Sequence, residues 1–232
     1  LPGGFVPSPT HAGGDTTARL WSTHPGQQVV TLSGHEGSVL GAAFSPDGKY
    51  AATGSMDGTA KVWDANTGEL LETLAGHKAW VLQANFSPDG ERVVTTSGDK
   101  TARIWTWRTG RTQFVLEGHQ RNVNYSTFSP DGEMVATSDG SGATLLWDLR
   151  TGRMLTKIGQ GHPTLKAWNA VFSPDARTVF TLNNGVYTWD AHTGQLLSSF
   201  ADKEIYTLQF ALSPDGGRFV LGGKNPSIRG AH

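Results

Sequence analysis

The sequence predicts an all-β fold in which one small antiparallel sheet is repeated along 232 residues. Three markers that recur together predict this fold. A tryptophan returns every 42 residues, Gly-His opens four successive units, and a Ser-Pro-Asp turn signal appears five times. The tryptophans are Trp21, Trp63, Trp105, Trp147 and Trp189, and the turn signals begin at Ser45, Ser87, Ser129, Ser173 and Ser213. A repeat of this length is one supersecondary unit that stacks against its neighbours.

Each repeat is expected to contain four short strands separated by tight turns. In the unit that begins at Gly34, apolar or alternating stretches are interrupted by Ser-Pro-Asp-Gly, Asp-Gly and Asn-Thr-Gly. Proline fixes φ and glycine accepts the conformations of a reversal, so the intervening stretches are predicted to be strands. In this unit the strands are expected over 39–44, 49–53, 59–63 and 69–74. Such a sheet cannot bury both faces alone, so other sheets must pack on it.

The chain starts and stops inside a repeat. Residues 16–21 and 27–32 are predicted to be a third and a fourth strand, and two strands near the C-terminus extend to Leu221. These four strands could complete one sheet and close a ring of about five sheets, which would remove exposed edges. The alternative is a fragment of a longer array. We expect a degenerate segment over 1–14 and a repeat domain over 15–232, with units at 15–33, 34–75, 76–117, 118–160, 161–200 and 201–232.

Composition and charge exclude several classes of function. The content of 37% hydrophobic residues and 30 glycines suits short strands joined by turns. A formal net charge of -1 offers no basic surface for nucleic acid or an anionic membrane. No apolar run approaches the roughly 18 residues that a membrane span needs. The chain has no cysteine, which excludes disulfides and thiolate zinc sites. A cytoplasmic location is the default expectation.

The markers resemble those of the WD40 repeat family. Gly-His opens a unit, and Trp-Asp closes it at 63–64, 147–148 and 189–190. The resemblance extends from about Asp15 to Arg229, which is nearly the whole chain. It implies a β-propeller, in which four-stranded blades surround a central channel.

The resemblance also implies a buried hydrogen-bond network of Ser or Thr, His, Asp and Trp within each blade. An indole N–H only donates, a neutral imidazole donates once and accepts once, and a carboxylate accepts, so the groups can satisfy one another. The expected members are His35, Thr53, Asp57 and Trp63 in the first full unit, His77, Thr95, Asp99 and Trp105 in the second, and His119, Thr137 and Trp147 in the third.

Later units depart from this pattern. In the third unit Ser141 stands where the aspartate is due, and Asp139 lies two residues early. In the fourth unit His162 and Trp189 remain, the turn is two residues shorter, and Asn183 or Asn184 is nearest to the missing carboxylate. We therefore expect the network to erode toward the C-terminus.

No pattern in the sequence predicts catalysis, a metal site or a cofactor. The Ser, His and Asp content of a blade could suggest a catalytic triad, but it recurs in every well-kept unit and accompanies a tryptophan. A nucleophile is needed once, so these groups are interpreted as structural. The other histidines, at 11, 24, 192 and 232, lack the spacing of metal ligands. An enzyme is the least favoured interpretation.

A partner-binding site is expected where the innermost strands begin. The resemblance implies that propellers bind peptides around the channel entrance, at residues seven and five before the turn serine. Here these positions are Ser38, Leu40, Trp80, Leu82, Asn122, Asn124, Lys166, Trp168, Tyr206 and Leu208. They differ between blades, and aromatic residues serve well as interface anchors, so Trp168 and Tyr206 are the preferred candidates. The alternative is that the leucines pack between blades.

Trp107 and Arg108 interrupt the repeat just after Trp105. They could project as a second contact patch, or pack on the edge of the blade.

The leading functional hypothesis is a non-catalytic scaffold that binds protein or peptide partners through the channel-entrance face, as a monomer if the ring closes. The alternative is a sensor or regulatory segment of a larger multidomain protein, such as an ATPase, kinase or protease. Neither nucleic acid nor a membrane is expected as a partner.

Overall fold

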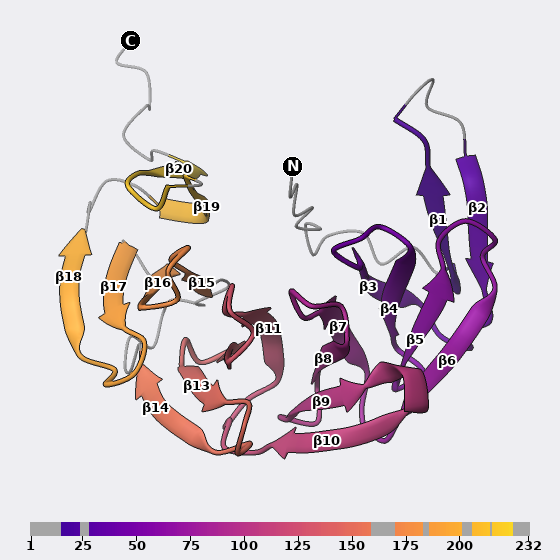
Figure 1. Ribbon diagram of the computed structural model, residues 1–232, viewed down its shortest axis with the longest axis horizontal. Coiled ribbons are helices and arrows are strands. Elements are labelled where there is room, and N and C mark those ends of the chain that lie inside the picture. Colours follow the sequence, from indigo (N-terminus) through magenta and orange to yellow (C-terminus); the bar gives the residue numbers. More distant parts are fainter. Residues whose placement is uncertain are drawn as a thin grey trace, which may run out of the picture. The chain divides into compact units, whose positions relative to one another are not determined.

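The computed structural model describes residues 15–23, 28–158, 170–182, 186–200, 206–213 and 215–224. In these residues the chain is all-β, and its one helical element is a single 3₁₀ turn. Consecutive strands pair antiparallel into four four-stranded sheets and two two-stranded sheets (Figure 1). The repeated all-β architecture predicted from the sequence is thereby confirmed. The chain forms two compact units, one of residues 1–118 and 122–124, the other of residues 119–121 and 125–232.

The first unit holds a two-stranded sheet followed by two complete sheets, which we call blade 1 and blade 2. The two-stranded sheet consists of β1 (Thr17–Trp21) and β2 (Gln28–Ser33). Blade 1 consists of β3 (Val39–Phe44), β4 (Tyr50–Ser55), β5 (Thr59–Asp64) and β6 (Leu70–Ala75). Blade 2 consists of β7 (Val81–Phe86), β8 (Arg92–Ser97), β9 (Ala102–Thr106) and β10 (Arg111–Leu116). In blade 1 the strand bounds lie within two residues of those expected from the turn residues.

The second unit holds two further complete sheets, blade 3 and blade 4, and a final strand pair. Blade 3 consists of β11 (Val123–Phe128), whose first two residues belong to the first unit, β12 (Met134–Asp139), β13 (Thr144–Asp148) and β14 (Met154–Ile158). Blade 4 consists of β15 (Ala170–Phe172), β16 (Thr178–Leu182), β17 (Val186–Asp190) and β18 (Leu196–Phe200). The final pair is β19 (Tyr206–Leu212) and β20 (Phe219–Lys224).

The Ser-Pro-Asp turns hold the first two strands together in blades 1 to 4 and in the final strand pair. After β3, the Ser45 hydroxyl donates to Asp47 Oδ1 at 2.6 Å and accepts the backbone N–H of Tyr50 at 3.0 Å. The same two bonds recur in the turns that begin at Ser87, Ser129, Ser173 and Ser213. The serine side chain therefore replaces a backbone partner at each reversal, which explains its regular return in the sequence.

The aspartate of each Trp-Asp pair caps the turn between the third and fourth strands. Asp64 Oδ1 accepts the backbone N–H groups of Asn66 and Thr67 at 2.8 and 2.9 Å. Blade 2 has Thr106 at this position, and a 3₁₀ turn over Trp107–Thr109, η1, forms there without a side-chain cap. The departure from Trp-Asp in the sequence therefore marks a real change of local structure.

The core of the first unit lies between blade 1 and blade 2 and includes Trp107. This side chain is only 3% exposed, and its ring lies 4.9 Å from Tyr50 and 6.0 Å from Phe86, measured between ring centroids. Its indole N–H donates to Gly90 O at 2.8 Å. Trp107 therefore packs on the edge of the blade, and the alternative that it projects as a contact patch is wrong.

Blade 1 and blade 2 approach closely along their first strands, β3 and β7. Gly41 lies so near the backbone of β7 that a Cβ at this position would overlap Leu82 O. Only glycine permits this approach, because it has no side chain to displace. The close contact fixes the ends of β3 and β7 relative to one another.

Among the described residues, no helix has the length and apolar character to cross a membrane.

Candidate functional site

Blade 1 contains a continuous chain of buried polar groups. The Trp63 indole N–H donates to Thr53 Oγ1 at 2.8 Å, and Thr53 Oγ1 lies 2.8 Å from His35 Nε2. His35 Nδ1 lies 2.7 Å from Asp57 Oδ2. Because the threonine hydroxyl accepts from the indole, it is free to donate to Nε2, which leaves Nδ1–H to donate to the carboxylate. Every member is satisfied by its neighbour.

Blade 2 repeats this arrangement with the same atoms. Trp105 donates to Thr95 at 2.8 Å, and His77 lies 2.8 Å from both Thr95 Oγ1 and Asp99 Oδ2. In blade 4 the Trp189 indole still donates to Thr181 Oγ1 at 2.8 Å, across a hairpin that is two residues shorter. The positions at His162, Asn183 and Asn184 lie outside the described residues.

The network of blade 3 is complete, which corrects the expectation that it erodes there. Asp139 Oδ2 lies 3.1 Å from His119 Nδ1, while Thr137 Oγ1 lies 2.7 Å from His119 Nε2 and accepts from Trp147. Serine and aspartate have exchanged places in this hairpin. Blade 1 has Ser55 followed two residues later by Asp57, whereas blade 3 has Asp139 followed by Ser141. The aspartate then reaches the histidine from the end of β12.

The charges in these networks are held in fixed states. Burial alone would raise the pKa of Asp57, but hydrogen bonds from Thr59, His35 and the backbone lower it well below its usual range. Burial lowers the pKa of the His35 and His77 imidazoles, although their aspartates oppose the effect. At neutral pH the networks of blades 1 and 2 thus each hold an ionised carboxylate and a neutral imidazole whose polar atoms are already engaged. These groups favour a structural role over a catalytic one.

Eight of the predicted binding residues lie among the residues that the structure describes, and six of these belong to the first unit. Ser38 and Trp80 directly precede β3 and β7, and each carbonyl accepts a backbone N–H from the turn after the second strand of its blade. Leu40 and Leu82 each occupy a β-bulge, where the register to the neighbouring strand shifts. We call this set the entrance face: Ser38, Leu40, Trp80, Leu82, Asn122 and Asn124.

Trp80 is the most exposed member of the entrance face. Its side chain is 39% exposed, whereas the other five are half-buried. The half-buried state of Leu40 and Leu82 agrees with both interpretations of the leucines, because each has a packed side and an open side. β-bulges re-aim side chains and often lie beside functional sites. Trp80 and the two bulges therefore make this the leading candidate surface.

The other four predicted binding residues lie toward the C-terminus. Lys166 and Trp168 lie outside the described residues. Tyr206 and Leu208 begin β19, where the register to β20 shifts between Thr207 and Gln209, as it does at the bulges of β3 and β7. The backbone pattern of the entrance face thus recurs in the final strand pair.

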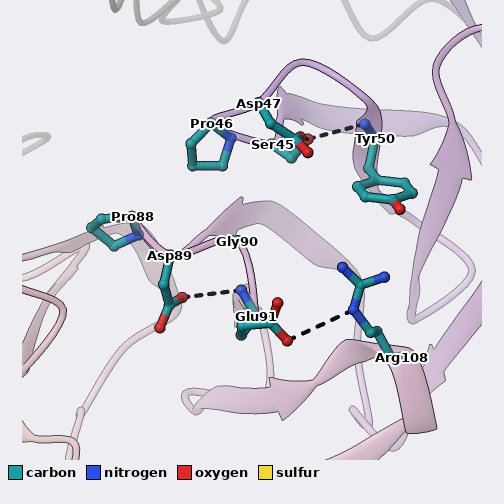
Figure 2. A pocket seen from close by; sticks show the side chains of 9 residues that line it. All are labelled: Ser45, Pro46, Asp47, Tyr50, Pro88, Asp89, Gly90, Glu91 and Arg108. Atoms are coloured by element: carbon teal, nitrogen blue, oxygen red, sulfur yellow. Dashed lines mark hydrogen bonds and ion pairs between the residues drawn. The ribbon is translucent and has the colours of Figure 1, made fainter.

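A pocket of about 340 Å³, which no pattern in the sequence predicts, lies at the opposite end of β3 and β7 from the entrance face. Figure 2 shows Arg108 and Glu91 facing each other beneath Tyr50. The Arg108 guanidinium lies 5.3 Å from the Tyr50 ring and 3.7 Å from Glu91, and Asp47 and Asp89 lie 3.5 and 3.7 Å from Lys49 and Arg92. Every carboxylate in the lining already faces a cation. The lining residues are Ser45, Pro46, Asp47, Tyr50, Pro88, Asp89, Gly90, Glu91 and Arg108.

The part of the chain that the structure describes brings together no group of three or more His, Asp or Glu side chains able to hold a metal ion. The pocket is lined by the turns after β3 and β7 together with Tyr50 and Arg108, and its charges are balanced in pairs. The entrance face, in contrast, combines an open aromatic ring with half-buried leucines. Its composition suits contact with another polypeptide.

Comparison with known proteins agrees with the repeat pattern. The family described as "IFT122 first beta-propeller" matches residues 11–229. Ribosome assembly protein 4 of Chaetomium thermophilum is 60% identical over 37 residues, or 16% of this chain and 7% of that protein. The guanine nucleotide-binding protein subunit beta of Arabidopsis thaliana and subunit beta-1 of Nicotiana tabacum are each 51% identical over 45 residues, or 19% of this chain and 12% of each plant protein. The matched segments thus span only a small part of these relatives.

Proposed function

The chain belongs to the family of the first β-propeller of IFT122, and from this premise we propose that it is a non-catalytic scaffold that binds protein or peptide segments through the entrance face. The names of two relatives point in the same direction for those proteins, since one is a subunit of a guanine nucleotide-binding protein and another acts in ribosome assembly. Because folds of this class host many functions, the proposal depends on the site itself.

The observation that carries the proposal is the exposed ring of Trp80 on a rigid support. Trp80 lies between two fixed features: the closed hydrogen-bond network at His77 and the β-bulge at Leu82. A large aromatic side chain on a rigid element loses little entropy when it binds, which suits an interface anchor. The satisfied networks support the non-catalytic part of the proposal, because they leave no free base beside a nucleophile.

Selection of peptides tests the proposal directly. A phage-displayed library of random dodecapeptides is panned against the chain, and the enriched peptides are titrated by fluorescence anisotropy. Trp80→Ala should weaken binding by about fivefold or more, the loss typical of an interface anchor. The matched control is Leu71→Ala on β6, which removes an apolar side chain of nearly equal exposure, 40% against 39%.

Three results bear on the entrance face. Loss of binding in Trp80→Ala with an unchanged melting temperature, and retention in Leu71→Ala, would support it. Equal binding by Trp80→Ala and the unmutated chain would reject it, as would a library that yields no peptide above the background of an unrelated protein. The double variant Trp168→Ala with Tyr206→Ala extends the same titration to the two anchors that the sequence favours.

A further inference from the structure

Two lysines flank Trp80 on the same end of blade 2. Lys78 precedes Trp80 by two residues, and Lys100 follows Asp99 in the turn between β8 and β9. The two segments are joined by hydrogen bonds, because Lys78 N–H donates to Asp99 Oδ2 at 3.0 Å and Gly98 N–H donates to Trp80 O at 3.0 Å. Both lysines are exposed. The backbone therefore presents Lys78, Trp80 and Lys100 together.

The charge of both lysines is available to a ligand. Neither ammonium forms an ion pair or a hydrogen bond with any residue that the structure describes. The nearby Asp99 does not neutralise them, because its carboxylate is only 9% exposed and accepts bonds from His77, Lys78 N–H and Thr101. In the pocket at the other end of the blade, by contrast, each carboxylate faces a cation.

Lys100 holds a backbone conformation that a lysine rarely adopts. Its φ is +70°, in the left-handed region, where the equivalent residues are Gly58 in blade 1 and Gly142 in blade 3. A side chain at such an angle is destabilising relative to glycine. Non-glycine residues in this conformation gather at ligand-binding sites, where the side chain has a use that offsets the strain. Lys100 is thus a second, independent indication that this point of the surface binds something.

The ring of Trp80 packs directly on Gly98. A Cβ on Gly98 would lie 2.5 Å from Trp80 Cε2 and 2.8 Å from Nε1, so the ring rests directly on the glycine backbone. In blade 1 the sizes at the two positions are reversed. The small Ser38 stands at the position of Trp80, and the large Met56, which is 54% exposed, stands at the position of Gly98. Of blades 1 and 2, only blade 2 therefore presents an aromatic ring packed directly on a glycine.

The charge pattern differs between the two blades in the same way. Blade 1 has Glu36 and Gly58 at the positions of Lys78 and Lys100. Of these two blades, only blade 2 thus has the cationic pair, and it also has the aromatic ring. A ligand for this surface needs an apolar group for Trp80 and negative charge on either side.

We infer that Lys78, Trp80 and Lys100 form a binding cradle for an acidic peptide segment in which an apolar residue lies close to Asp or Glu. This inference rests on the proposed function, because it names the chemistry of the partner at the entrance face. The apolar residue packs on the Trp80 ring and displaces water from it. The carboxylates pair with the two ammonium groups, which carry no competing partner.

The selected dodecapeptides provide the test. They should be enriched in Asp and Glu beside an apolar residue. The double variant Lys78→Glu with Lys100→Glu should weaken their binding by about tenfold or more, since each exposed pair contributes about two- to fivefold. Raising the salt from about 0.05 M to about 0.5 M should weaken it as well, because salt screens exposed charges. The matched control, Arg153→Glu just before β14 with Lys157→Glu on β14, makes the same change of net charge elsewhere and should leave binding unchanged.

Two further variants isolate the parts of the cradle. Lys100→Gly should weaken peptide binding while raising stability, which a purely structural lysine would not do. Gly98→Ala should weaken binding by displacing the Trp80 ring, since Gly98 has an ordinary φ that alanine accepts.

The outcomes separate this inference from the proposed function. Peptides that need Trp80 but bind the lysine variants normally, or that show no excess of acidic residues, would overturn the cradle and leave the scaffold in place. Peptides that bind Trp80→Ala normally, or a library without binders, would overturn both. Loss of binding in the Trp80 and lysine variants, with the control intact, would support both.

Discussion

Single residues in this chain have backbone angles or burial that bear directly on stability. Lys100 occupies a backbone conformation that the hairpins of blades 1 and 3 give to glycine. His35 and His77 are buried with their polar atoms engaged, so their protonation is tied to folding. Each case leads to a measurement on the free protein, without any ligand.

Replacing Lys100 by glycine should raise the free energy of unfolding by about 1 kcal/mol, because the strain of a Cβ at positive φ is removed. Urea denaturation of the two proteins measures the difference. Lys100→Ala keeps the Cβ and serves as the control, so it should give little or no gain. Equal stabilisation by alanine and glycine would mean that the lysine side chain, and not the backbone angle, is unfavourable.

Stability should fall as the pH drops through about 6.5, the usual pKa of an unfolded histidine. Burial lowers the pKa of His35 and His77 in the folded chain, so the unfolded chain binds protons first. The two histidines therefore stabilise the folded chain above this pH, and this stabilisation is lost as the pH falls below it. Urea denaturation at several pH values between about 7.5 and about 5 measures the loss of stability, and the His77→Gln variant is compared with the unmutated chain. A variant with the same pH slope as the unmutated chain would contradict the assignment.

At the scale of the element, the hairpins tolerate rearrangement better than the sequence pattern indicates. The turns after β4 and β12 have the same length, and Gly58 N–H and Gly142 N–H each donate to the last residue of the preceding strand. Serine and aspartate can therefore exchange positions while the carboxylate still reaches the histidine. The 3₁₀ turn η1 is a second local rearrangement, and it adds a buried tryptophan to the core.

The exchange in blade 3 predicts strong coupling between Asp139 and Ser141. Asp139→Ser should lower the free energy of unfolding by about 1–3 kcal/mol, because His119 loses its acceptor. Adding Ser141→Asp should recover most of this loss, since it restores the order found in blade 1. A double-mutant cycle by denaturation measures the coupling. Additive losses would show that the two positions are not interchangeable.

Removing the buried Trp107 side chain of η1 should lower the free energy of unfolding far more than removing an exposed tryptophan. Trp107→Ala should cost about 3–5 kcal/mol, as is usual for a buried aromatic residue. Trp80→Ala is the control and should change stability by less than about 1 kcal/mol, because its ring is partly in solvent. Similar losses in the two variants would mean that Trp80 also supports the core.

At the scale of the whole molecule, periodicity predicted the fold, because turn chemistry is local. The strands of blade 1 could be placed from Pro46, Asp57 and Gly68 without knowledge of tertiary contacts. The network of blade 3 could not, since the exchange of Asp139 and Ser141 becomes visible only when both positions surround one histidine. The seat of Trp80 on Gly98 likewise depends on a contact between segments 18 residues apart. An alignment of the repeats on their tryptophans does show that Ser38 and Met56 of blade 1 correspond to Trp80 and Gly98 of blade 2.

Closure of the ring stays a prediction. If the strands at the two ends complete one blade, the chain should be a compact monomer of 24.8 kDa with no free sheet edge to recruit a second copy. Size-exclusion chromatography with light scattering measures the mass. Dimers or larger species that form at micromolar concentration would contradict closure.

The paired exchange of Ser38 and Met56 for Trp80 and Gly98 also has a consequence for engineering. If the entrance face binds peptides as proposed, a few interchangeable positions carry recognition, while the supporting framework stays constant between blade 1 and blade 2. Ser38→Trp combined with Met56→Gly would copy the aromatic seat onto blade 1. Adding Glu36→Lys and Gly58→Lys would copy its charges. A chain with two such seats would offer a bivalent receptor for acidic peptides, in which avidity could be set by the spacing of motifs in the ligand.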